Sequence, residues 1–126
     1  MSGALLDTSV VIADDSGLAL PPKTTISVVT IGELRAGILL ASDPSTRTAR
    51  QARFAAVTAA YRPLPVDQAV AERYGEVLAG ARSARRVTTA TDLLIIATAA
   101  ATGRRLYTLD TRQAKLAVDL GVAVAN

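Results

Sequence analysis

The sequence predicts an α/β domain in three layers, with a mostly parallel central sheet of four to five strands flanked by helices. Short apolar runs alternate with segments of helical periodicity along the 126 residues. Such alternation is typical of a parallel sheet whose strands are connected by helices. Two apolar runs, Ala4 to Leu6 and Leu106 to Leu109, lead directly into an acid followed by a hydroxyl residue. No linker or repeat divides the chain, so we expect one domain over residues 1–126.

The first half of the chain is expected to contain two strands and three helices. Pro21-Pro22 breaks the chain after the first helix. Ile31, Leu34 and Ile38 recur at three- and four-residue spacing and indicate the second helix. In order, the segments are a strand at 4–6, a helix at 8–15, a loop at 16–22, a strand at 25–28, a helix from 30 to about 42 and a helix at 45–60.

The second half should add up to three strands and three helices. Asp67 is a suitable N-cap for an amphipathic helix that ends near Ala81. The helix that Thr91-Asp92 opens is apolar nearly all round and should be buried, and Gly103 should end it. The segments are a strand at 64–66, a helix at 68–81, a helix at 91–101, a strand at 104–109, a helix at 112–120 and a strand at 122–125.

The chain contains no cysteine and no histidine. This composition excludes disulfides, thiolate nucleophiles, Cys/His zinc sites and catalysis by imidazole. An enzyme of this composition must rely on carboxylates, hydroxyls, Arg and Lys. Carboxylate oxygens without nitrogen or sulfur ligands select hard cations such as Mg²⁺ or Mn²⁺.

The formal net charge is +3, and all basic residues except Lys23 and Lys115 are arginine. A basic surface around an acidic site suits a polyanionic substrate; solubility and a compositional bias toward arginine are the alternative explanation. The longest apolar stretch, residues 93–101, is too short to span a bilayer. We therefore expect a cytoplasmic protein with no membrane segment.

Four acids stand at the start of expected helices: Asp7, Glu33, Asp92 and Asp110. Each has a structural explanation, because Thr30-x-x-Glu33 matches a capping box and strand-terminal acids are good N-caps. Capping does not explain why two of them directly follow apolar strands. The carboxyl ends of parallel strands form the ligand-binding edge of an open α/β sheet, so the four acids are expected to share one site.

A divalent cation would resolve the repulsion among four converging carboxylates. Such an ion polarises a phosphoryl group and lowers the pKa of a bound water, so hydrolysis needs no histidine. Hydroxyl residues beside the acids can orient the carboxylates or metal-bound waters, with ordinary turn and cap chemistry as the alternative. These residues are Thr8, Ser9, Thr108 and Thr111.

The arrangement resembles the PIN-domain family, and within it the small VapC-type toxins of bacterial toxin–antitoxin pairs. The resemblance covers nearly the whole chain and rests on four motifs in order rather than on any single one. They are Leu5-Leu6-Asp7-Thr8-Ser9, Ser27 to Leu34, Thr91 to Ala99, and Leu106 to Asp110. One departure is Thr91, where the family has a small or amide residue before the acid.

The resemblance implies a Mg²⁺- or Mn²⁺-dependent endoribonuclease that acts on RNA. Asp7, Glu33, Asp92 and Asp110 would be its acidic quartet, with Asp7 and Asp92 as the direct ligands and the other two completing or water-bridging the site. It also implies homodimerisation and inhibition by a VapB-type antitoxin whose C-terminal segment enters the acidic site. The apolar faces of the helices that begin near Thr8 and Thr30 are candidate antitoxin surfaces, unless the core buries them.

Five arginines are candidates for RNA phosphate contacts: Arg82, Arg85, Arg86, Arg104 and Arg105. A solvated surface loop is the alternative explanation for the first three. Asp14 and Asp15 lie outside the four motifs and are interpreted as a solvated helix end.

Three other functions remain open from the residues alone. A PIN-like module that binds RNA or an antitoxin without cleavage would keep the fold. A haloacid-dehalogenase-like phosphatase would use Asp7 as nucleophile, but Ser9 stands where its second acid is expected. A receiver-type phosphoacceptor would use Asp14-Asp15 and Lys115, although these acids do not end a strand.

Overall fold

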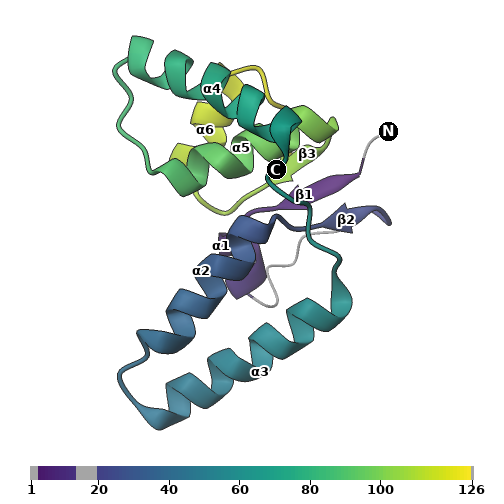
Figure 1. Cartoon of the computed structure of the whole chain (residues 1–126), viewed down its shortest axis with the longest axis vertical. Coiled ribbons are helices and arrows are strands. Elements are labelled where there is room, and N and C mark those ends of the chain that lie inside the picture. The colour runs from purple at the N-terminus through teal and green to yellow at the C-terminus, as the bar shows by residue number, and fades with distance from the viewer. Residues whose placement is uncertain (1–2, 14–19, 126) are drawn as a thin grey trace.

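The computed structural model describes residues 3–13 and 20–125. Within those ranges, four short parallel strands form one sheet in the order β2-β1-β3-β4 (Figure 1). The strands are β1 (Ala4–Leu6), β2 (Thr24–Thr25), β3 (Arg105–Tyr107) and β4 (Val124–Ala125). The helices are α1 (Thr8–Ile12), α2 (Val28–Leu39), α3 (Pro44–Ala60), α4 (Gln68–Ser83), α5 (Ala90–Thr102) and α6 (Thr111–Asp119).

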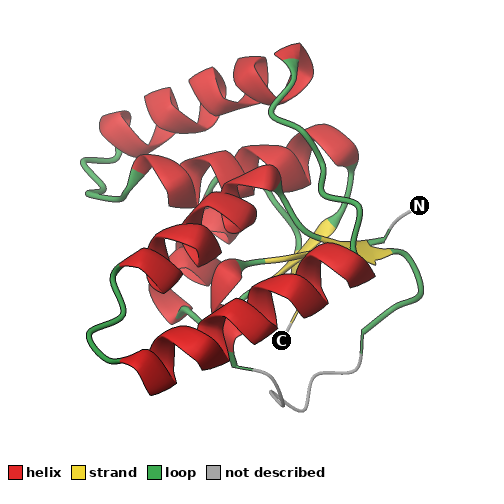
Figure 2. Cartoon of the chain, turned by 60° about the horizontal axis from the view of Figure 1, so that its bottom comes forward, coloured by secondary structure: helices red, strands yellow, loops and turns green. Residues whose placement is uncertain are grey.

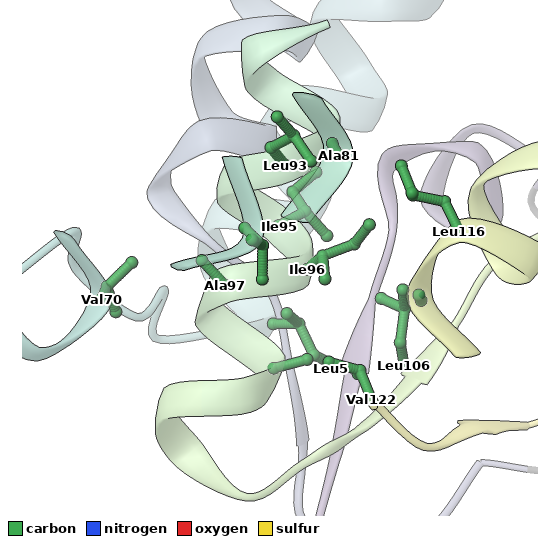
Figure 3. Packing of buried hydrophobic residues seen from close by; sticks show 13 residues of the cluster. Leu5, Val70, Ala81, Leu93, Ile95, Ile96, Ala97, Leu106, Leu116 and Val122 are labelled. Carbon is green, nitrogen blue, oxygen red and sulfur yellow. The ribbon is translucent and has the colours of Figure 1, made fainter. Parts of the chain in front are cut away.

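Adjacent residues of β1 enter two different cores. Leu5, with Leu106 of β3, packs among apolar side chains of α4, α5 and α6 (Figure 3). Leu6 packs with Val10 of α1, Leu34 of α2 and side chains of α3. Because successive side chains of a strand point to opposite faces, the sheet separates the two cores. The predicted three-layer α/β fold is confirmed, and helices lie on both sides of the sheet in Figure 2.

The strand predicted at 64–66 is wrong. Leu64 forms only an isolated parallel bridge with Ser27, in which its N–H donates to the Ile26 carbonyl at 2.8 Å and its own carbonyl accepts from Val28 at 3.0 Å. Both the N–H and the carbonyl of Leu64 face this segment, and the pairing stops at one bridge because Val28 already begins α2. Pro63 and Pro65 have no N–H with which to pair on the opposite side.

The strand predicted at 25–28 is also misplaced, since β2 ends at Thr25 and Val28 is already helical. The Ser27 hydroxyl accepts the N–H of Val29 at 3.0 Å and makes Ser27 the N-cap of α2. Consequently Thr30 and Glu33 lie inside the helix, and the capping-box interpretation of this pair is wrong. Glu33 is available for another role.

Other predicted boundaries are confirmed within one to three residues. Asp67 accepts the Val70 N–H at 3.0 Å and is the N-cap of α4, while Gly103 ends α5 in the left-handed conformation with a φ of 64°. Helix α1 ends at Ile12, and the predicted continuation through Asp14 and Asp15 lies outside the described residues. No helix in the described part of the chain has the length and apolar character needed to cross a membrane.

Candidate catalytic site

Asp7 leaves β1 as a buried acid surrounded by hydrogen-bond donors. Its backbone N–H donates to the Tyr107 carbonyl at 2.8 Å, so Asp7 continues the pairing of β1 with β3. The residue is 4% exposed, and its Oδ2 accepts the hydroxyl of Ser9 at 2.6 Å and that of Thr108 at 3.0 Å. The Ser9 N–H adds a longer bond at 3.3 Å, which makes Asp7 the N-cap of α1. These donors offset the cost of burying a carboxylate.

Backbone groups fix the direction in which both hydroxyls donate. The Leu109 N–H donates to the Ser9 hydroxyl oxygen at 3.0 Å, and the Asp110 N–H donates to the Thr108 hydroxyl oxygen at 3.0 Å. Each hydroxyl therefore accepts from the loop after β3 and is free to donate its own proton to Asp7. The chain between β3 and α6 holds the carboxylate in one orientation.

Gln113 completes the surroundings of Asp7, and the sequence analysis did not single it out. It lies in the first turn of α6 and is 4% exposed. We assign its amide nitrogen toward Asp7, where it donates to Oδ1 and Oδ2 at 3.1 Å each, because the reverse orientation would set the amide oxygen against the carboxylate. Asp110 caps α6 and accepts the Gln113 N–H at 3.2 Å. The spacing Asp110-x-x-Gln113 is that of a capping box, which is the sequence signal that points to Gln113.

Glu33 is held by a hydroxyl of the neighbouring helix. The Thr8 hydroxyl donates to Oε1 of Glu33 at 2.5 Å and lies 2.9 Å from the hydroxyl of Thr30. Thr8 and Thr30 are buried, so this polar contact links α1 to α2 beneath the site. Thr8 and Ser9 are thus both hydrogen-bonded to acids of the quartet.

Asp92 lies in the first turn of α5, where Thr89 is the N-cap and accepts the Asp92 N–H at 3.2 Å. Burial is the largest cause that raises the pKa of Asp92, and a hydrogen bond with Thr89 opposes the rise. The negative charges of the other three acids raise this pKa further, in the order Asp7, Asp110 and Glu33. The fold therefore brings the other three predicted acids within electrostatic reach of Asp92.

The four acids do not form a ready cation cage. Among the residues that the structure describes, no three acidic side chains make a group that could hold a metal ion as they stand. The donor chemistry nevertheless fits a hard divalent cation, since carboxylate, hydroxyl and amide oxygens are present without histidine or cysteine. Oδ1 of Asp7 accepts only from Gln113 among the described residues, which leaves lone pairs for a cation.

A cleft of about 380 Å³ opens beside the acids at Asp92 and Asp110. Asp110 is exposed, and its Oδ1 accepts the N–H groups of Arg112 and Gln113 at 3.0 and 3.2 Å. Thr111 is exposed and, in the described part of the chain, makes no side-chain hydrogen bond to any acid. The cleft gives a substrate access to two of the four acids.

The five predicted RNA-contacting arginines are divided between two ends of the sheet. Arg86 lines the cleft beside the acids, and Arg82 lines a neighbouring cavity against α4. Arg85 follows α4 with a left-handed φ of 55° and an exposed side chain. Arg104 and Arg105 stand at the start of β3, whereas Asp7 and Asp110 follow the ends of the parallel strands β1 and β3. They line a different cavity, of about 350 Å³, between the end of α5 and the connection from α6 to β4.

Comparison with known proteins gives the site a family context. A family model of the PIN domain matches residues 4–119 of this chain. Ribonuclease VapC8 of Mycobacterium tuberculosis is 45% identical over 100 residues, which cover 75% of this chain and 88% of that protein. Ribonuclease VapC4 of the same organism is 35% identical over 112 residues and covers 85% of each chain.

Solved structures agree with the sequence matches. The crystal structure of VapBC-5 from Mycobacterium tuberculosis, a member of the VapBC family of toxin–antitoxin systems, matches with a TM-score of 0.83 and 32% identity over 92% of this chain and 91% of that chain. FitAcB from Neisseria gonorrhoeae matches with a TM-score of 0.79 and 26% identity over 98% and 96% of the two chains. On these matches, this chain belongs to the PIN-domain family and, within it, to the VapC group.

Proposed function

We propose that this chain is a Mg²⁺- or Mn²⁺-dependent endoribonuclease and acts as the toxin of a toxin–antitoxin pair. The observation that carries the proposal is the convergence of Asp7, Asp110 and Glu33 on Asp92, whose pKa their charges raise, in a chain without histidine or cysteine. Carboxylates that repel one another at the mouth of a cleft are suited to a divalent cation. The relatives named ribonucleases VapC8 and VapC4 support RNA as the substrate.

The residues that would hold the cation are Asp7 and Asp92, with Asp110 and Glu33 completing the site directly or through water. The cation supplies Lewis-acid polarisation of the phosphodiester and lowers the pKa of water. The chain's own residues orient the ligands. Ser9, Thr108 and Gln113 hold the Asp7 carboxylate, and Thr8 holds that of Glu33. This preorganisation limits the reorganisation that the site needs during hydrolysis.

Cleavage of labelled cellular RNA by the purified chain, with Mn²⁺ and with EDTA, tests the proposal. We expect discrete fragments that require the cation and disappear in Asp7→Asn and in Asp92→Asn. Asp67→Asn is the matched control, because Asp67 is also an N-cap, on α4 and outside the four acids. It should cleave like the unmodified chain, with thermal unfolding confirming that each variant is folded.

The outcomes separate the competing functions. No cleavage by folded, Mn²⁺-supplied and antitoxin-free protein would support the non-cleaving RNA- or antitoxin-binding module. Cleavage that survives both acid variants would mean that the acids are wrongly assigned. The family match gives no support to the phosphatase or phosphoacceptor alternatives, and hydrolysis of a small phosphate ester would be the result that revives the phosphatase.

A VapB-type antitoxin is the proposed protein partner. The structural neighbour VapBC-5 is a member of the VapBC family of toxin–antitoxin systems. Large apolar side chains remain exposed on α1 and at both ends of α2, at Ile12, Val28, Leu39 and Leu40. Co-expression with a VapB-type antitoxin should yield a complex in which the antitoxin buries these side chains from solvent. Homodimerisation stays a prediction, and light scattering after size-exclusion chromatography decides it.

A further inference from the structure

The cleft beside Asp92 and Asp110 contains two arginines with different surroundings, Arg86 and Arg112. Arg86 donates to the Asp119 carboxylate at 2.8 Å, so its guanidinium already has an anionic partner. Asp119 is the last residue of α6, and this ion pair ties the loop after α4 to the end of α6. Arg86 therefore already has an anionic partner in this structure.

Arg112 lies in the same cleft without such a partner. Its backbone N–H donates to Oδ1 of Asp110 at 3.0 Å, which fixes its position in the first turn of α6. Its side chain is exposed, and among the described residues no carboxylate lies within 4.0 Å of its guanidinium. A guanidinium that borders two acids and pairs with neither is available for another anion.

We propose that Arg112 binds a backbone phosphate of the RNA that occupies this cleft and so positions the scissile bond over the acids. The inference rests on the proposed ribonuclease function. The lining favours a phosphate contact over base recognition, because none of the described residues that line the cleft is aromatic. A planar guanidinium matches two phosphate oxygens, and a cation here counters the repulsion between RNA and the four acids.

Arg112 is not one of the five arginines that the sequence predicts to contact RNA. Arg104 and Arg105 border the separate cavity at the start of β3, and Arg82, in the last turn of α4, lines another cavity. Sequence clustering singled out those residues, whereas Arg112 stands alone in the chain. The reason for choosing Arg112 is its position beside Asp110 at the mouth of the cleft, where a positive charge can contact a phosphate that lies over the acids.

The experiment compares three full-length chains: unmodified, Arg112→Gln and Lys115→Gln. Lys115 is the matched control, since it is an exposed cation on α6 that does not line the cleft. Cleavage of a fluorescent single-stranded RNA in Mn²⁺ gives kcat and KM over a salt series, and fluorescence anisotropy in EDTA gives binding of the same RNA. The shift in melting temperature with Mn²⁺ reports the acids independently of RNA.

Arg112→Gln should lower kcat/KM by about tenfold, mainly through KM, as expected for loss of one charge-assisted phosphate contact. The slope of log binding constant against log salt should become shallower by about 0.7, the value for one phosphate contact on a single strand. Arg112→Lys should keep the salt slope and recover part of the affinity, because it retains charge but not the bidentate geometry. The Mn²⁺ shift should not change in any of these variants.

Equal behaviour of Arg112→Gln and Lys115→Gln would overturn the inference while leaving the ribonuclease proposal intact. If the unmodified chain binds RNA without cleaving it, the ribonuclease proposal fails and the anisotropy comparison still tests Arg112. If the unmodified chain neither binds nor cleaves RNA, both fail. A loss of the Mn²⁺ shift in Arg112→Gln would mean that Arg112 supports the acids rather than the phosphate.

Discussion

The Thr108 hydroxyl donates to Oδ2 of Asp7 at 3.0 Å, although the two residues lie 101 positions apart. Pairing of β1 with β3 in parallel register brings them together, because both residues follow the ends of these strands. The same Thr108 oxygen accepts the Asp110 N–H. One hydroxyl thus connects a buried acid at the end of β1 with the backbone of the acid that follows β3.

Thr108→Val removes this hydroxyl and nearly keeps the side-chain shape. It leaves the Asp7 carboxylate short of a donor and the Asp110 N–H without its acceptor, so the free energy of unfolding should fall by about 1–3 kcal/mol. RNA cleavage should fall as well, because Asp7 loses part of its orientation. Urea unfolding and cleavage assays measure the two effects.

Thr102→Val is the control for that substitution, since its hydroxyl donates to the Thr98 carbonyl at the far end of α5. It should leave cleavage unchanged. Equal losses of cleavage in the two variants would show that Thr108 acts through general stability.

Gln113→Glu should replace a donor to Asp7 with a second carboxylate. Two carboxylates in hydrogen-bond contact repel each other, which raises the pKa of at least one of them above its value in the unfolded chain. The destabilisation is then absent at a pH below the unfolded carboxyl values, about 4, and grows as pH rises through the raised pKa. Urea unfolding in EDTA at pH 4 and pH 7 checks this. The prediction is contradicted if the free energy of unfolding differs between the variant and the unmodified chain by the same amount at both pH values.

Asp92→Asn should stabilise the metal-free protein at neutral pH. Burial and the neighbouring acids raise the pKa of Asp92 in the folded state. The folded protein therefore holds this proton more tightly than the unfolded chain does, and its stability falls as pH rises from the unfolded pKa through the raised pKa. The amide removes that cost, so the gain in unfolding free energy should be present at pH 7 in EDTA and much smaller at about pH 4, close to the unfolded pKa of Asp.

Mn²⁺ provides the internal check on Asp92→Asn. A cation that binds only the folded protein stabilises it by mass action. Mn²⁺ should therefore raise the free energy of unfolding of the unmodified chain, and raise that of the variant much less. Glu72→Gln, an exposed change on α4, should follow the unmodified chain. A variant that is less stable than the unmodified chain in EDTA at pH 7 would count against the proposed repulsion.

Gly103→Ala should destabilise the protein without altering the site. Gly103 ends α5 with a φ of 64°, and apart from its two chain neighbours no described residue has an atom within 4 Å of the position that a Cβ would occupy. The cost is therefore the left-handed conformation alone, about 1–2 kcal/mol. Thermal unfolding measures the loss, and kcat/KM of the folded variant should equal that of the unmodified chain. An unchanged melting temperature would contradict this interpretation.

Local patterns in the sequence determined most of the helices and the two acids that end strands. An N-cap such as Asp67 and a helix-ending Gly103 act through neighbours in the chain, so their effects can be predicted from the chain alone. The composition without histidine or cysteine also limited the candidate catalytic groups to carboxylates, hydroxyls, Arg and Lys. The prediction failed at Leu64, where the pairing is limited to one bridge because the partner segment becomes helical at Val28.

Tertiary structure alone decided how the site is held together. The contact of Thr8 with Glu33 depends on how α1 packs against α2, and the contact of Gln113 with Asp7 depends on where β3 delivers α6. The same strand order, β2-β1-β3-β4, sets Arg112 beside the acids and Arg104 at a separate cavity. Such contacts join residues far apart in the chain, and the energy that favours them comes from packing of the two cores, which no local pattern encodes.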